Sequence, residues 1–196
     1  MILRNLHKSE ISKILENLKT KGFIKIENLI KPKKSKILLN LLNKIYKKGV
    51  NNKGLPGRDA NDLRINNLAK RDKIFCDLIS DPQLEKFLKP KLNDKYYRFL
   101  PDSVPNYILG GYNGRSSGDK LDLHIDSFMP YTGDYNNAIL VLFVLENMSG
   151  ENGATIVVPK SHKSGTYTDR NSKNVKVINA NAGDVLILDA RTWHGT

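Results

Sequence analysis

The sequence contains a single cysteine, Cys76, among its 196 residues. One cysteine cannot form an internal disulfide, which excludes a disulfide-stabilised scaffold and is typical of the reducing cytoplasm. Long hydrophobic runs are also missing, since the longest, residues 138–145, is far shorter than the roughly 20 residues that cross a membrane. The N-terminus has neither an apolar signal core nor a small-residue cleavage site. We therefore expect a cytoplasmic protein with no membrane partner.

Acidic residues are scarce relative to basic ones. The chain has 32 Lys and Arg against 20 Asp and Glu, a net charge of +12, and residues 31–57 hold eight lysines and no acid. Such an excess attracts nucleic acid, membrane surfaces or phosphorylated substrates. A Lys- and Asn-rich composition imposed by an AT-rich genome would produce the same excess. No nucleic-acid-binding motif accompanies the lysines, so nucleic acid is a disfavoured but open partner.

Length and composition favour one domain over residues 1–196. Hydrophobic residues make up 39% and charged residues 27%, as in globular proteins, and the length suits a single core. Residues 1–92 carry apolar positions at helical spacing, and residues 93–196 carry short strand-like runs. The predicted helices are 9–18 with Ser9 as N-cap, 32–48 beginning at Pro32, and 73–88 in two pieces divided at Asp81 and Pro82. Residues 23–26 read as a short strand, 51–67 as a loop.

The second half predicts a mainly β fold. Seven short runs rich in β-branched or aromatic residues are separated by Gly, Pro, Asn or Asp turns, which suggests a sandwich or jelly roll. The predicted strands are residues 96–100, 107–112, 121–125, 138–145, 154–158, 175–178 and 185–188. A polar loop, residues 114–120, precedes the third of them and is placed where a lid or a simple linker would lie.

Two histidines and an aspartate suggest a metal site. His124 and Asp126 are two residues apart, so on a strand both side chains would point to the same face, and His194 lies near the far end of the sequence. Two imidazoles and one carboxylate form the facial triad that holds Fe(II) and leaves other coordination positions open. A short H-x-D pattern alone arises often by chance, so the flanking sequence has to support it.

Three stretches in order provide that support: His124 to Ser127, Leu145 to Lys163 and Ala182 to Gly195. Together they resemble the phytanoyl-CoA dioxygenase family of Fe(II)/2-oxoglutarate oxygenases, and the helical first third is similar too. The resemblance implies a double-stranded β-helix, a cupin-like jelly roll, with helices packed on one sheet. It implies Fe(II) bound by His124, Asp126 and His194, with 2-oxoglutarate as co-substrate. Lys160 stands where the family usually has glycine, and we expect a changed turn there.

The resemblance also implies features beyond the sequence given. In the family, a final strand follows the distal histidine and carries an arginine that pairs with the distal carboxylate of 2-oxoglutarate. The sequence ends at Thr196, so we expect that strand and its arginine beyond this point. Within the sequence, Lys120 and Thr196 are candidates for binding 2-oxoglutarate, although Lys120 reads equally well as a solvated loop residue.

Other residues are candidates for smaller roles. Ser127, Phe128 and Tyr131 directly follow the metal motif and could line a substrate pocket. His162 belongs to a P-x-S-H element that is structural in the family, so we expect it to stabilise a turn. Arg191 would face away from His194 on a regular strand. No residue beyond the metal ligands is predicted to be catalytic.

The predicted function is a dioxygenase that hydroxylates a small molecule with O2 and 2-oxoglutarate and releases succinate and CO2. One alternative is a metal-binding β-barrel that does not turn over 2-oxoglutarate. A second is a nucleic-acid-directed oxygenase, which only the net charge supports. The sequence indicates neither the substrate nor the oligomeric state.

Overall fold

The computed structural model describes residues 1–47, 68–97, 121–127, 129–134, 136–169 and 171–196. The predicted loop 51–67, the predicted strand 107–112 and the loop 114–120 lie outside the described residues, as does most of the predicted strand 96–100. Within the described part, no helix is long and apolar enough to cross a membrane.

The helices precede most of the strands, as the sequence predicts. The helices are α1 (Lys8–Thr20), α2 (Pro32–Lys47), α3 (Leu68–Arg71), α4 (Lys73–Ile79), α5 (Pro82–Leu92) and the 3-10 turn η1 (Ser161–Lys163). The strands are β1 (Phe23–Ile26), β2 (Ile139–Phe143), β3 (Ile156–Val157), β4 (Lys176–Val177), β5 (Val185–Asp189) and β6 (His194–Gly195). They form two antiparallel sheets, with strand orders β1-β5-β2 and β4-β3-β6.

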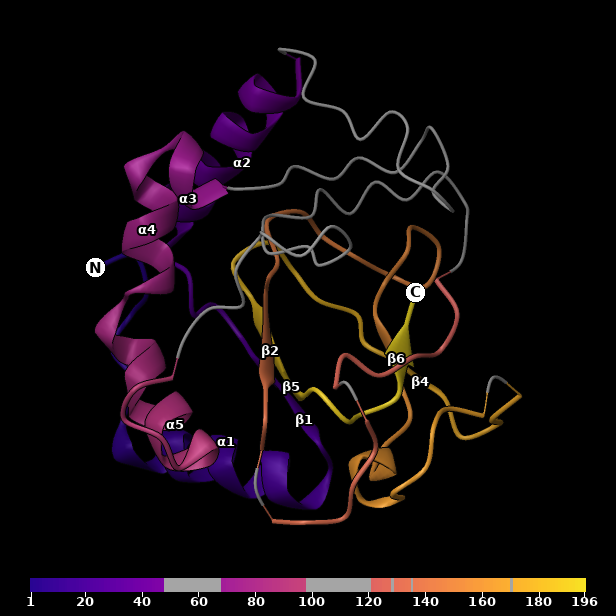
Figure 1. Ribbon diagram of the computed structural model, residues 1–196. Coiled ribbons are helices and arrows are strands. Elements are labelled where there is room, and N and C mark those ends of the chain that lie inside the picture. The colour runs from indigo at the N-terminus through magenta and orange to yellow at the C-terminus, as the bar shows by residue number, and fades with distance from the viewer. Residues whose placement is uncertain (48–67, 98–120, 128, 135, 170) are drawn as a thin grey trace.

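The sheet β1-β5-β2 is the middle layer of the molecule. Figure 1 shows helices α3 to α5 on one side of it and strands β4 and β6 on the other. Side-chain alternation along β5 explains this arrangement, because successive residues point to opposite faces. Val185 and Ile187 are buried against the helices, whereas Leu186 and Leu188 are buried in a second cluster with Val157 of the other sheet. Strand β5 is therefore buried on both faces.

The predicted helices are confirmed, with some changes at their ends. Helix α5 runs to Leu92, beyond the predicted end at 88, and the short helix α3 lies outside the predicted ranges. Helix α1 begins after His7 rather than at Ser9, because the Glu10 side chain reaches back to accept a hydrogen bond from the His7 N–H at 3.1 Å. Pro32 is the first residue of α2, as predicted, and Asp81 caps α5 by accepting from the Gln83 N–H.

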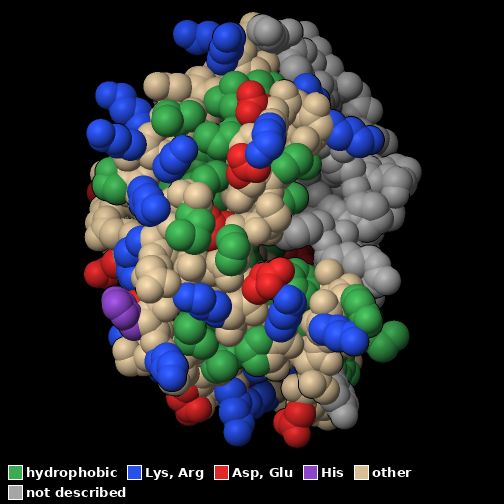
Figure 2. Space-filling view, turned by 90° about the vertical axis from the view of Figure 1, so that its left-hand side faces the viewer, with side chains coloured by type: hydrophobic (Ala, Val, Ile, Leu, Met, Phe, Trp, Pro, Cys, Tyr) green, Lys and Arg blue, Asp and Glu red, His purple; other side chains and the backbone are tan. Residues whose placement is uncertain are grey.

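The lysines of α2 lie mostly on its solvent face, as an amphipathic helix requires. Lys33, Lys36 and Lys44 are exposed, while Leu38 and Leu42 are buried. Figure 2 shows that Lys and Arg side chains are spread over the helical side of the molecule with Asp and Glu between them. On that face the positive charge forms no single stripe of the kind that follows a nucleic-acid backbone.

The predicted strands match the structure unevenly. The predicted ranges 138–145, 154–158 and 175–178 contain β2, β3 and β4, and 185–188 covers all of β5 except its last residue, Asp189. The strand predicted over residues 121–125 is wrong, since only His124 forms an isolated bridge there, opposite His194. The described residues form helices and antiparallel sheets without a closed barrel.

Candidate metal centre

His124, Asp126 and His194 come together at one end of the second sheet. One side-chain ligand atom from each of the three lies within 4.8 Å of the others. The Nε2 atom of His124 is 3.7 Å from Oδ1 of Asp126, and the Nε2 atom of His194 is 3.5 Å from Oδ2 of the same carboxylate. Among the described residues, this is the group of His, Cys, Asp and Glu side chains that could hold a metal ion.

Backbone pairing places the two histidines directly opposite each other. The His124 N–H donates to the His194 carbonyl at 2.8 Å, and the His194 N–H donates to the His124 carbonyl at 3.0 Å. The two imidazole ring centroids are 4.3 Å apart, with the planes tilted by 48°. A short antiparallel bridge, rather than a long strand, therefore brings these residues together across 70 positions of sequence.

The second nitrogen of each imidazole defines its tautomer. Nδ1 of His124 lies 2.9 Å from the Asp122 carbonyl oxygen, and Nδ1 of His194 lies 2.8 Å from the Thr192 carbonyl oxygen. A carbonyl oxygen only accepts, so in the neutral ring the hydrogen is on Nδ1 and the Nε2 lone pair faces the Asp126 carboxylate, where it can bind a metal. Such outer hydrogen bonds orient the imidazoles of metal sites.

The Asp126 carboxylate faces both imidazoles. Its partial burial by itself raises the pKa, but when the imidazoles are protonated the hydrogen bond with His194 and the charges of His194 and His124 outweigh this effect and lower the pKa below its ordinary value. The carboxyl group is thus ionised at neutral pH. The Asp126 side chain is still 42% exposed, whereas that of His194 is 7% exposed, so one side of the group is open.

Gly195 allows the two segments to approach. A Cβ at this position would meet the backbone carbonyl oxygens of Leu121 and Asp122. Beyond it, the Thr196 N–H donates to the Leu121 carbonyl at 3.0 Å. From the histidine pair to this bond, the first segment runs three residues, from His124 to Leu121, whereas the second runs two, from His194 to Thr196. The extra residue acts as a bulge, which is why residues 121–125 do not form a regular strand.

The remaining predicted site residues have varied surroundings. The Thr196 hydroxyl accepts a hydrogen bond from the Leu121 N–H at 3.0 Å, and the Ser127 hydroxyl donates to the Met129 carbonyl. The Tyr131 hydroxyl accepts from the Asn137 N–H at 2.9 Å. Lys120 and Phe128 lie outside the described residues. The roles predicted for these five residues in binding co-substrate or substrate stay predictions.

His162 lies where a structural residue would. It is buried in η1, and its Nε2 atom is 3.1 Å from the Lys19 carbonyl oxygen at the end of α1. It also lies against Gly22, because a Cβ there would be 2.6 Å from the His162 Nδ1 atom. Lys160, just before η1, adopts a φ of 69°, the left-handed conformation that glycine favours. The turn therefore has the backbone conformation of a glycine residue despite the lysine.

Asp189 and Arg191 form a buried ion pair that sequence reasoning missed. The guanidinium forks onto the carboxylate through Nε at 2.9 Å and Nη2 at 2.8 Å. The D-x-R spacing before the distal histidine is visible in the sequence. A turn at the end of β5 brings the two side chains together, however, and strand periodicity does not predict that turn.

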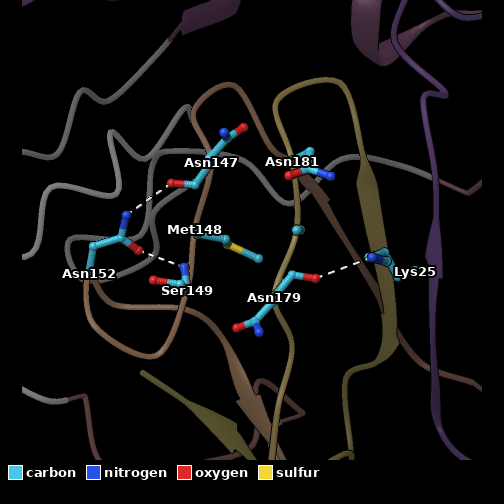
Figure 3. Close-up of a pocket in the computed structure, with 8 residues that line it drawn as sticks. Lys25, Asn147, Met148, Ser149, Asn152, Asn179 and Asn181 are labelled. Carbon is cyan, nitrogen blue, oxygen red and sulfur yellow. Dashed lines mark hydrogen bonds between the residues drawn. The ribbon is translucent and has the colours of Figure 1, made fainter.

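A cavity is also present away from the triad. A polar pocket of about 300 Å³, shown in Figure 3, opens between the turn 147–152 and residues 179–181. The Asn152 amide closes its own turn by accepting from the Ser149 N–H and donating to the Asn147 carbonyl, and Lys25 donates to the Asn179 carbonyl. The polar groups of this pocket thus largely stabilise turns, and no residue of the triad lines it.

The triad fits a divalent metal ion by the chemistry of its donors. When both rings are neutral, two Nε2 lone pairs and one carboxylate face one another, an arrangement that repels itself unless a cation or a proton intervenes. Two nitrogens and one oxygen are the donor set that non-haem Fe(II) uses, with further positions open to other ligands. Fold and site together define a helix-backed β-sheet protein with a candidate facial-triad metal centre.

Comparison with known proteins gives the family. Residues 18–196 match the phytanoyl-CoA dioxygenase (PhyH) family, and the chain belongs to it. The match includes all three triad residues, most of the helical part and both sheets. It confirms the family resemblance found in the sequence.

Individual relatives are more distant. The chain is 28% identical over 138 residues to "Dioxygenase af480" of Aspergillus fumigatus, an alignment that covers 68% of this chain and 42% of the relative. The chain thus spans less than half of the length of that protein.

Solved structures share the fold. HygX from Streptomyces hygroscopicus, solved with nickel and 2-oxoglutarate bound, superposes with a TM-score of 0.65 at 19% identity, covering 98% of this chain and 81% of that one. The non-haem α-ketoglutarate-dependent epimerase SnoN from nogalamycin biosynthesis has a TM-score of 0.68 at 12% identity, covering 96% and 76%. At such identities the likeness shows the fold alone.

Proposed function

We propose that this protein is an Fe(II)- and 2-oxoglutarate-dependent oxygenase whose metal is held by His124, Asp126 and His194. One observation carries the proposal: three acceptor groups converge, and backbone carbonyls hold both imidazoles in the tautomer that turns the Nε2 lone pair toward Asp126. Membership of the phytanoyl-CoA dioxygenase family supports the reaction class. One fold can support many functions, so the function is inferred from the geometry of the three side chains rather than from the fold.

The chain's residues have distinct tasks in this proposal. His124 and His194 present neutral Nε2 donors, and Asp126 supplies the negative charge that offsets part of the metal charge. Three protein ligands leave three positions of an octahedron for other ligands. When bound, Fe(II) supplies the activation of O2 coupled to oxidation of 2-oxoglutarate to succinate and CO2. The open side at Asp126 is where co-substrate and substrate would enter.

The proposed reaction is hydroxylation of a small molecule. HygX binds 2-oxoglutarate together with nickel, which supports the same co-substrate here, while the epimerase SnoN shows that a related fold supports another outcome. Ser127 and Tyr131 adjoin the triad in sequence and remain proposed substrate contacts. Thr196 and Lys120 remain proposed contacts of 2-oxoglutarate.

We propose further that residues 1–196 form one domain built on a double-stranded β-helix. Two observations support this architecture: the two sheets pack face to face through Leu186 and Val157, and helices cover the outer face of the first sheet. The family match runs through both parts without a break.

The proposal is tested by anaerobic addition of Fe(II) and then 2-oxoglutarate to the metal-free protein. We expect a weak visible charge-transfer band that needs both additions and is lost in Asp126→Ala. A matched control is Asp122→Ala, because Asp122 contacts His124 through its backbone carbonyl, which the substitution keeps. Iron binding without the band would favour the alternative, a metal-binding protein that does not use 2-oxoglutarate. Absence of iron binding would contradict the proposal.

A further inference from the structure

Arg191 is buried and is held by three residues, Asp189, Gly133 and Tyr131. Its guanidinium forks onto Asp189, and its Nη1 atom donates to the carbonyl oxygens of Gly133 at 2.7 Å and Tyr131 at 3.3 Å. The guanidinium carbon also lies 4.4 Å from the centroid of the Tyr131 ring, a cation–π distance. The Arg191 side chain is only 7% exposed. It therefore bridges the turn after β5 and the segment 129–134 that follows the H-x-D motif.

Asp189 extends this bridge to a second point. Besides Arg191, its Oδ2 atom accepts a hydrogen bond from the Asn136 side-chain amide at 2.5 Å. Asn136 is 4% exposed and Asp189 is 1% exposed, so solvent cannot replace these bonds. The Tyr131 hydroxyl closes the same loop by accepting from the Asn137 N–H. Tyr131, Gly133 and Asn136 are thus tied to Asp189 and Arg191 through several side-chain bonds.

Ala190, the residue between Asp189 and Arg191, also contacts the triad. The Ala190 carbonyl oxygen, flanked by Asp189 and Arg191, accepts from the Asp126 N–H at 2.9 Å and from the Ser127 N–H at 3.0 Å. His194, the first residue of β6, follows three residues after Arg191. The turn after β5 is therefore linked both to the carboxylate ligand, through the Ala190 carbonyl, and to the distal imidazole, through the chain.

We propose that the Arg191–Asp189 pair is a positioning device for the metal centre, and that it fixes Asp126 and the segment 129–134 beside the histidines. This inference rests on the proposed function, since it concerns the metal held by the triad. A planar guanidinium is suited to the task because it binds a carboxylate with two bonds and still has donors for two carbonyls. Lysine keeps the charge but cannot reproduce the fork.

The structure offers a matched control at the other end of the molecule. Arg4 also forks onto a carboxylate, that of Glu10 at 2.7 and 3.1 Å, and also donates to backbone carbonyls, those of Glu27 and Asn28. It joins the N-terminal segment to α1, and no triad residue is among these partners. The Arg4 side chain is 35% exposed and that of Arg191 is 7% exposed. Arg191→Lys and Arg4→Lys therefore remove the same forked hydrogen bonding from a buried place and from a more exposed one.

The first readout is affinity for Co(II) in the absence of any substrate. Trp193, the single tryptophan of the chain, adjoins His194, so quenching of its fluorescence reports binding at the triad. Loss of an outer partner of a metal ligand typically weakens binding roughly 10–100-fold. We expect Arg191→Lys to weaken Co(II) binding by about this factor and Arg4→Lys to leave it within about twofold, as for distant sites.

The second readout needs no metal. Chymotrypsin cleaves after tyrosine, and Tyr131 lies in the segment that Arg191 holds. We expect metal-free Arg191→Lys to be cut after Tyr131 at least several-fold faster than the parent protein, and Arg4→Lys to be cut at the parent rate. Circular dichroism would establish that both variants stay folded.

The outcomes separate the two proposals. If the parent protein does not quench with Co(II), the proposed metal site fails, and the proteolysis result still decides whether Arg191 holds the segment. If the parent protein binds Co(II) and Arg191→Lys binds it equally well, the positioning role is overturned, whatever the cleavage rate. Weaker binding in Arg191→Lys and Arg4→Lys alike would also overturn it, because the effect would then follow from general destabilisation.

Discussion

The carboxylates of the scaffold and the carboxylate of the candidate metal centre have opposite environments. Asp81, Asp184 and Asp189 are each 1% exposed, and hydrogen donors meet their oxygens. Asp81, for example, accepts from the N–H groups of Ile2, Leu3 and Gln83 at 2.7 to 3.1 Å. The Asp126 side chain is 42% exposed, and two imidazole nitrogens lie 3.5 and 3.7 Å from its carboxylate oxygens.

This difference separates stability from function. A buried carboxylate surrounded by fixed donors stabilises the fold and has no capacity left for a ligand, because its lone pairs are used. The Asp126 carboxylate faces two groups that are acceptors when neutral, so its bonding is incomplete without a cation. The scaffold carboxylates should therefore matter for unfolding, and Asp126 should matter for metal.

The largest effect on stability is expected for Asp189→Asn. The substitution leaves the Arg191 guanidinium buried without its counter-charge, and loss of one partner of a buried ion pair costs about 3–5 kcal/mol. Urea unfolding followed by circular dichroism measures the free energy of unfolding. A loss below about 1 kcal/mol, the value of exposed pairs, would contradict the assignment of Asp189 to the scaffold.

A smaller loss is expected for Asp81→Asn. Asparagine has one acceptor oxygen where Asp81 has two, so either the N–H groups of Ile2 and Leu3 or that of Gln83 lose their acceptor. A buried N–H left without an acceptor costs about 1–3 kcal/mol. Metal affinity should be unchanged in this variant, because Asp81 belongs to the junction of α4 and α5 in the helical layer (Figure 1). A Co(II) titration beside the unfolding curve checks both parts, and weakened metal binding would break the separation.

His162 predicts how the stability of the scaffold depends on pH. Burial lowers the pKa of His162 below its ordinary 6.5, more than the bond with the Lys19 carbonyl raises it. The unfolded chain then binds a proton more readily than the folded chain, so the free energy of unfolding falls as pH falls below 6.5. In His162→Gln we expect a smaller slope between pH 6.5 and 5, since the titrating group is gone. An identical slope in both proteins would show that His162 is not buried as a neutral ring.

The smallest effect on stability is expected for Asp126→Asn without metal. The side chain is partly exposed and its ion pairs are long, so the free energy of unfolding should change by less than about 1 kcal/mol. Because the pKa of Asp126 is lowered by folding, its small contribution to the free energy of unfolding is present at neutral pH and is lost as the pH falls below the ordinary 3.8. A loss as large as that of Asp189→Asn would place Asp126 with the scaffold and remove the distinction.

Much of this arrangement follows from local sequence patterns. Apolar spacing predicts α1 and α2, the Asp81–Pro82 pair predicts the break between α4 and α5, and the H-x-D and distal histidine patterns identify residues that the structure brings together. These features can be predicted because the helices depend on residues close in sequence, and because two histidines and an aspartate form a ligand set that is typical of one kind of metal site.

Other features depend on contacts that no local pattern describes. The strand predicted for residues 121–125 is replaced by a single bridge, because a bulge opposite Gly195 interrupts the pairing. The environment of Arg191 is equally non-local, since its partners Tyr131 and Gly133 lie about 60 positions earlier in the chain. Helix α1 begins earlier than predicted because the His7 N–H donates to the Glu10 side chain, which makes His7 the N-cap. Residue propensity alone favours Ser9 at that position.

The most direct measurement is anaerobic equilibrium dialysis of the parent protein and Asp126→Asn against Fe(II). We expect the parent protein to bind one iron per chain. In Asp126→Asn we expect the affinity for iron to fall by more than the roughly 100-fold that loss of an outer partner of a metal ligand costs at most. The free energy of unfolding should stay nearly unchanged. Equal iron binding in the two proteins, or none in the folded parent, would contradict the claim that His124, Asp126 and His194 form the metal centre.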